Sequence, residues 1–254
     1  MDFLAELSNR NIHLYIFGWV CVAGSFACIL CIFLTQVEVL GINAFIKPLK
    51  FFLSTVIFSW TMAWYLGYLD VSFTTKAYTW TVILVLSFEL FWITYKAAIG
   101  ELSHFNISSS FNGFMFSMMG ISISIMTLFT LYIGILFWVQ SFPQLPLAYL
   151  WGIRLGIICF VIFAFQGGIM GAQLAHTVGA ADGGPGLPLV NWSTKFGDYR
   201  IAHFVGMHAL QILPLIGYYL LTSTKGIVLF SILYFGLCLA VLIQAMMKMP
   251  LLRF

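Results

Sequence analysis

The chain has 254 residues, of which 62% are hydrophobic and only 7% are charged, and its mean hydropathy is +1.02. This composition leaves too little polar surface for a soluble domain and is typical of a polytopic membrane protein, with the lipid bilayer as its surroundings. The net charge of +3 comes from eleven basic and eight acidic residues. So few basic side chains cannot form the surface that nucleic-acid binding requires, so nucleic acid is excluded as a partner.

Seven apolar stretches are long enough to cross the hydrocarbon core of a bilayer, which takes about 20 helical residues. They cover residues 12–35, 49–69, 77–99, 113–140, 147–175, 201–222 and 226–247. A backbone in lipid must satisfy its own hydrogen bonds, so each stretch is predicted to be a helix. The sequence therefore predicts an all-α integral membrane protein, a bundle of seven transmembrane helices in a single polytopic domain over residues 1–254.

The basic residues near the ends of the spans are unequally divided between the two sides of the membrane. Three fall on the side of the N-terminus, namely Arg10, Lys76 and Lys225, and six on the opposite side, namely Lys47, Lys50, Lys195, Arg200, Lys248 and Arg253. Basic loops stay in the cytoplasm, which predicts an outside N-terminus and a cytoplasmic C-terminus in a plasma or bacterial inner membrane. Lys47 and Lys50 are interpreted first as anchors at the headgroup level, and alternatively as an anion site.

The connection between the fifth and sixth spans, residues 176–200, is rich in glycine and proline. Its segment 179–188 is too irregular to face lipid, so it is expected to be a capping or re-entrant loop. Because His176, His203 and His208 lie close to it in sequence, the loop is interpreted as a lid or substrate loop, with a plain connection as the alternative. In the fifth span, glycines and alanines between 167 and 175 predict a seam for close helix packing.

Glu89 lies in the middle of the third span, where a carboxylate costs a few kcal/mol or more unless it is neutral, paired or facing a cavity. It is interpreted as part of a proton relay or as a counter-ion for a ligand, and alternatively as a protonated acid that serves packing. Lys96 falls on the same helical stripe. The further side chains expected to bind substrate are Gln173, Arg200 and Gln211, with Arg200 and Lys96 holding an anionic group.

Four of the five histidines fall on one side of the membrane. His104, His176 and His203 are candidate ligands for zinc or iron, and three such ligands with one open position are typical of a catalytic site. Glu101 and His104 have a spacing that di-iron sites use, provided that their segment is helical. His203 and His208 are about 140° apart on an ideal helix, so they cannot both bind one ion from a straight helix.

Three functional hypotheses follow from these residues. The first is a membrane metalloenzyme, a zinc hydrolase or an iron oxidoreductase, that acts on a lipid or other lipophilic substrate with His208, Glu101 or Asp198 as acid or base. The second is a proton-coupled transporter or channel for a small molecule that uses Glu89 and the polar helix faces. The third is a redox protein with a single haem, bound by His176 together with His203 or His208.

Overall fold

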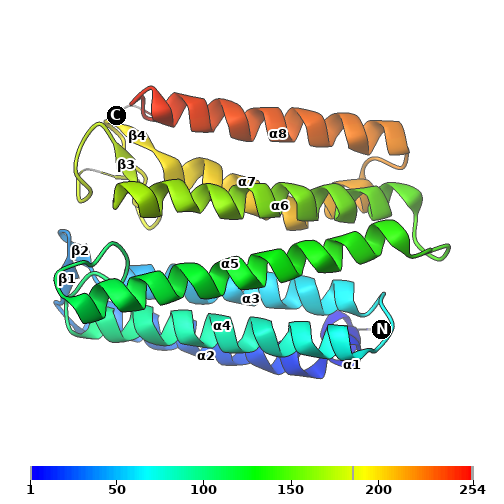
Figure 1. Ribbon diagram of the computed structural model, residues 1–254, viewed down its shortest axis with the longest axis horizontal. Coiled ribbons are helices and arrows are strands. Elements are labelled where there is room, and N and C mark those ends of the chain that lie inside the picture. Colours follow the sequence, from blue (N-terminus) through cyan, green and yellow to red (C-terminus); the bar gives the residue numbers. More distant parts are fainter. Residues whose placement is uncertain (1, 185, 253–254) are drawn as a thin grey trace. The chain divides into compact units, whose positions relative to one another are not determined.

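The computed structural model describes residues 2–184 and 186–252. Pro185 of the Gly/Pro-rich segment and the basic residue Arg253 lie outside them. The structure is 72% helical and has almost no sheet. Within the described residues there are eight helices and two short antiparallel strand pairs (Figure 1).

Seven of these helices, all within the described residues, are long and apolar enough to cross a membrane. They are α2 (Ile12–Leu34), α3 (Ile46–Leu66), α4 (Phe73–Ala98), α5 (Ser110–Val139), α6 (Leu147–Gln173), α7 (Tyr199–Tyr219) and α8 (Thr224–Met246). Their bounds agree with the predicted spans to within four residues, which confirms the all-α membrane fold with seven spans. The sides on which the two termini lie stay a prediction.

The chain forms two compact units that divide within α5. Unit 1 covers Met1–Met126 and holds α1 to α4 with the first part of α5, and unit 2 covers Thr127–Phe254 and holds the rest of α5 with α6 to α8. The single polytopic domain stays a prediction. Each unit is described on its own below.

In unit 1 a short helix, α1 (Phe3–Arg10), is fastened to the C-terminal end of α3. Arg10 donates from Nη1 to the carbonyl oxygen of Trp64 at 3.1 Å and from Nε to Glu6 at 2.8 Å. Its guanidinium also lies over the rings of Trp64 and Tyr68, at 4.2 and 4.4 Å from their centroids. Because the last carbonyls of a helix have no partner within it, Arg10 satisfies a group that α3 leaves open.

In unit 2 the backbones of α6 and α7 approach closely at glycines that the sequence interpretation did not select. A Cβ atom on Gly152 would lie 2.7 Å from the carbonyl oxygen of Leu213, and one on Gly156 would lie 2.8 Å from that of Ala209. The spacing of these two glycines is the small-residue motif that permits close helix contact in lipid. In the predicted seam a Cβ on Gly168 would meet open space, whereas one on Gly167 would lie 2.8 Å from the imidazole of His203 in α7.

Two connections are closed by short strand pairs. In unit 1, β1 (Glu38–Val39) pairs with β2 (Ile42–Asn43) between α2 and α3. In unit 2, β3 (Thr177–Val178) pairs with β4 (Gly197–Asp198), which ties the two ends of the Gly/Pro-rich loop together. Gly197 packs directly against the backbone of Ala245 in α8, where a Cβ atom would overlap the carbonyl oxygen. The loop is therefore anchored at its base, and its capping or lid role stays a prediction.

Candidate functional site

Glu89 is buried in the interior of unit 1. It lies 16 residues into the 26-residue helix α4, about 24 Å from the helix start at 1.5 Å per residue, and only 6% of its surface is exposed. Its Oε1 atom has no hydrogen-bond partner among the described residues. The charged side chain that acts on it is Lys47 of α3. The structure thus places an acid with open hydrogen-bonding capacity at membrane depth, where such a group is expensive and marks a functional site by default.

Lys47 connects Glu89 electrostatically with a histidine outside the helices. It lies in the first turn of α3, and its Nζ atom is 3.2 Å from Nδ1 of His104. A lysine ammonium can only donate, so in this contact Nδ1 of His104 accepts. The imidazole is also 3.2 Å from the hydroxyl of Ser103 and packs beside the ring of Phe51. Lys47 thus has an internal contact in unit 1, and its role as a headgroup anchor or an anion site stays a prediction.

Lys96 and Glu101 form a separate pair at the end of α4. Lys96 is 4% exposed, and its Nζ atom lies 2.5 Å from Oε2 of Glu101 and 4.9 Å from the centroid of the Trp92 ring. The condition for the pairing of Glu101 with His104, a helical segment, is not met. Gly100, with a φ of +71°, follows the end of α4, and residues 101–104 are not helical, so the two side chains contact different lysines.

In unit 2, His176 is held by Asp182 at the base of the Gly/Pro-rich loop. The Nδ1 atom of His176 lies 2.6 Å from Oδ2 of Asp182, and the carboxylate also accepts from the backbone N–H groups of His176 and Thr177. Burial by itself would raise the pKa of Asp182, but the hydrogen bonds from the imidazole and the backbone outweigh it and lower that pKa below its ordinary value of 3.8. The carboxylate therefore orients the histidine.

Asp198 and Arg200 join the same loop to the start of α7. Asp198 caps the helix by accepting from the backbone N–H of Arg200 at 3.0 Å, and it also accepts from that of Ser193 at 2.8 Å. Arg200 binds the carboxylate through Nε and Nη2, at 2.9 and 2.6 Å, and donates to the carbonyl oxygen of Asn191. Both residues thus have internal partners that stabilise the loop. Their predicted roles in acid–base chemistry and anion binding stay predictions.

The two histidines of α7 face different surroundings, in agreement with their separation around the helix. His203 donates from Nδ1 to the carbonyl oxygen of Phe163 at 2.6 Å, while Nδ1 of His208 lies 3.2 Å from Oε1 of Gln211. The ring of His208 also lies 4.4 Å from that of Phe204.

Two glutamines of α6 differ in how well their amides are satisfied. Gln173 donates to the hydroxyl of Tyr199 at 3.5 Å. Gln166, which the transport hypothesis places on the polar route, is 7% exposed, and neither of its amide atoms has a partner among the described residues. A buried amide without partners is costly in a membrane span.

The predicted metal ligands are divided between the two units. His104 belongs to unit 1, whereas His176 and His203 belong to unit 2. Within the described ranges, no group of three or more His, Cys, Asp or Glu side chains is placed to hold a metal ion. In unit 2, however, Nδ1 of both histidines contacts an oxygen at 2.6 Å, which is how a metal-bound imidazole is commonly oriented.

The sequence matches no protein-family model, and no curated protein or solved structure matches it either. The fold supports an integral membrane protein with seven spans. Its function is therefore argued from the side chains described above.

Proposed function

We propose that the protein carries out proton-coupled transport across the membrane, with Glu89 as the group that takes up and releases the proton. The observation that carries the proposal is the burial of Glu89 at membrane depth with an unpartnered oxygen, under the influence of a lysine that also contacts a histidine. Chains of acidic and histidine side chains are the usual proton routes of membrane proteins.

Lys47 has two competing partners in this arrangement. When Glu89 is ionised, its negative charge attracts the ammonium of Lys47. When Glu89 is protonated this attraction disappears, whereas the contact of the ammonium with His104, at 3.2 Å, does not depend on it. The position of the Lys47 side chain would therefore change with the protonation of Glu89, and its contact with His104 would transmit this change to the loop that follows α4.

His104 is the point at which the proton would exchange with water. It lies outside the spanning helices and is half-buried, and imidazole is the side chain that most often passes protons in proteins. Lys96 does not compete for Glu89, because its ammonium is held by Glu101 and by the ring of Trp92. The solute that the proton accompanies would contact the polar residues of unit 2, with Gln173 and Gln211 as first candidates.

The test is proton flux into vesicles that contain the purified protein and an enclosed pH-sensitive dye. Under an imposed membrane potential, wild-type vesicles are expected to acidify or alkalinise faster than protein-free vesicles, and Glu89→Gln is expected to abolish the difference. The matched control is Glu38→Gln, which alters an exposed acid in β1. Equal flux in the wild type and Glu89→Gln, or no flux above protein-free vesicles, would overturn the proposal.

A second candidate function is metal- or haem-dependent chemistry in unit 2, favoured by the orientation of His176 and His203. Because Nδ1 of His203 contacts the carbonyl oxygen of Phe163, the other ring nitrogen, Nε2, is the atom that would bind a metal. A metalloenzyme acting on lipids, with zinc or iron, requires a third ligand, and the described residues supply none to this pair. His176 and His203 would instead hold one haem, which when bound would supply electron transfer.

This candidate is tested by a visible absorption spectrum and elemental analysis of the purified protein. A Soret band that is lost in His203→Ala would support the haem, and near-stoichiometric zinc or iron without that band would support the metalloenzyme. Metal-free protein without visible absorption would exclude both. His208→Ala is the matched variant, because its imidazole contacts Gln211 and Phe204.

A further inference from the structure

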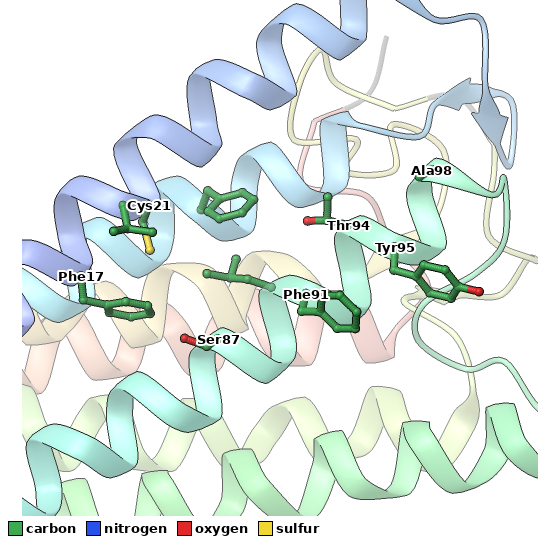
Figure 2. Close-up of a pocket in the computed structure, with 10 residues that line it drawn as sticks. Phe17, Cys21, Ser87, Phe91, Thr94, Tyr95 and Ala98 are labelled. Atoms are coloured by element: carbon green, nitrogen blue, oxygen red, sulfur yellow. The ribbon is translucent and has the colours of Figure 1, made fainter.

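Unit 1 has an elongated apolar groove between α2 and α4, with Phe52 of α3 among its lining residues. Figure 2 shows Phe17 and Cys21 of α2 on one side and Ser87, Phe91 and the residues that follow them on α4 on the other. The volume of the groove is about 450 Å³, and its lining is almost entirely apolar. Both rims are formed by helices that are long and apolar enough to span the membrane, so the groove opens onto hydrocarbon.

Phe52 enters the groove because α2 has a glycine at the contact. A Cβ atom on Gly24 would overlap the Phe52 ring, so any larger residue there would displace the ring. On α4 the lining residues recur at helical spacing from Ser87 to Ala98, which makes one continuous stripe. The groove is therefore formed by side chains of three helices, α2, α3 and α4.

The length of the groove along α4 corresponds to the thickness of one leaflet of a bilayer. From Ser87 to Ala98 is about 16 Å along the helix at 1.5 Å per residue, and half of a hydrocarbon core of about 30 Å is about 15 Å. Ser87 lies near the middle of α4, whereas Tyr95, with a half-exposed ring, lies near its end. Tyrosine at that depth is typical of the membrane–water interface.

Thr94 provides a polar group at the interfacial end of the groove. Threonine hydroxyls in a helix usually bond to the carbonyl four residues earlier, as those of Thr79 and Thr81 do in α4. The hydroxyl of Thr94 is buried and has no hydrogen-bond partner among residues 2–184 and 186–252. Rotation about χ1, for which threonine has two accessible states in a helix, changes the direction of the hydroxyl and would let it donate to a molecule in the groove that Thr94 lines.

We propose that the groove binds one acyl chain of a diacyl phospholipid, with the Thr94 hydroxyl as the donor to the ester carbonyl of that chain. The chain would run along the stripe from Ala98 toward Ser87. The ester of a bilayer lipid lies at the boundary between headgroup and hydrocarbon, the depth at which Thr94 and Tyr95 are found. The bound lipid is thus drawn from the leaflet on the side where α4 ends.

The test uses the full chain reconstituted in phosphatidylcholine vesicles that contain a phosphatidylcholine with a diazirine on one acyl chain. After illumination, mass spectrometry of the peptides is expected to place the cross-links on the groove residues of α2 and α4, well above the level on lipid-facing residues of α8. Ser87→Phe, which fills the groove, is expected to reduce the groove cross-links to the level of α8. Thr94→Val is expected to reduce them about fivefold, the factor for one net hydrogen bond.

Two variants of α4 control for general effects on the helix. Leu84→Phe enlarges a side chain that is 66% exposed and lies outside the groove, and Thr81→Val removes a hydroxyl that already has a backbone partner. Both are expected to retain the cross-linking of the wild type. Cross-links spread evenly over all the spans, or groove cross-links that survive Ser87→Phe, would overturn the proposal. Groove labelling by a diazirine fatty acid but not by the diacyl lipid would overturn it as well.

Discussion

Replacing Asp198 distinguishes a stabilising role from a catalytic one. Its side chain is completely buried, and its carboxylate accepts from two backbone N–H groups and from the guanidinium of Arg200. Asp198→Ala removes the cap of α7 and leaves the Arg200 charge, which is 26% exposed, without its partner. The backbone N–H of Ser193 loses its acceptor in the same change.

The expected loss of stability is large because one substitution removes all of these contacts. Removing a helix cap costs about 1 kcal/mol, and removing one partner of a buried ion pair costs about 3–5 kcal/mol. The two contributions overlap, and the partial exposure of Arg200 reduces the second, so the free energy of unfolding should fall by about 3 kcal/mol. Asp198→Asn keeps one oxygen acceptor but turns an NH₂ group toward the donors on the other oxygen and removes the charge, so it should cost about 2 kcal/mol.

Both variants can be compared by denaturant titration in mixed micelles, with helical circular dichroism as the signal. Asp70→Ala is the control, since it alters an exposed acid and should change the free energy of unfolding by less than about 0.5 kcal/mol. If Asp198→Ala were as stable as Asp70→Ala, the stabilising role would be refuted. A loss of activity without loss of stability would instead identify Asp198 as an acid or base.

Three further predictions concern packing, pH and the N-terminal helix. Gly156→Val should lower the free energy of unfolding by about 1–3 kcal/mol, because its Cβ would lie 2.8 Å from a carbonyl oxygen of α7, whereas Gly168→Val should be better tolerated. Because the pKa of Asp182 is lowered in the folded state, its stabilisation should be complete above pH 3.8 and shrink as the pH falls below that value. The free energy of unfolding measured against pH should lose this acid dependence in Asp182→Asn. A pH curve that is the same in the wild type and the variant would contradict the prediction. Arg10→Ala should cost about 1–2 kcal/mol and expose α1 to protease, and equal cleavage rates would count against its role as a clamp.

The seven spans could be predicted because lipid leaves few choices to an apolar chain. Each stretch had to form a helix of about 20 residues, and the structure moves its ends by at most four residues. Glu89 could be selected as a candidate from its position alone, since a carboxylate at that depth is rare without a function, and its role stays a prediction. Composition and periodicity suffice for both inferences because both depend on local sequence alone.

The partners of the charged side chains could not be predicted in this way. Lys47 and His104 are 57 residues apart, and their contact depends on how the start of α3 packs beside the loop after α4. The positive φ of Gly100 redirects the chain and separates Glu101 from His104, which no helical wheel can show. The close contact of α6 with α7 at Gly156 likewise depends on which face of α6 meets its neighbour.

The proton exchange of Glu89 can be measured directly by infrared difference spectroscopy of the reconstituted protein during a change of pH. A protonated carboxyl band that appears and disappears with pH, is missing in Glu89→Gln and responds more slowly in His104→Ala is the predicted result. Glu101→Gln should retain the band, because that acid is held by Lys96 outside the proposed route. Identical difference spectra for the wild type and Glu89→Gln would show that Glu89 does not exchange its proton, and would contradict proton-coupled transport through this residue.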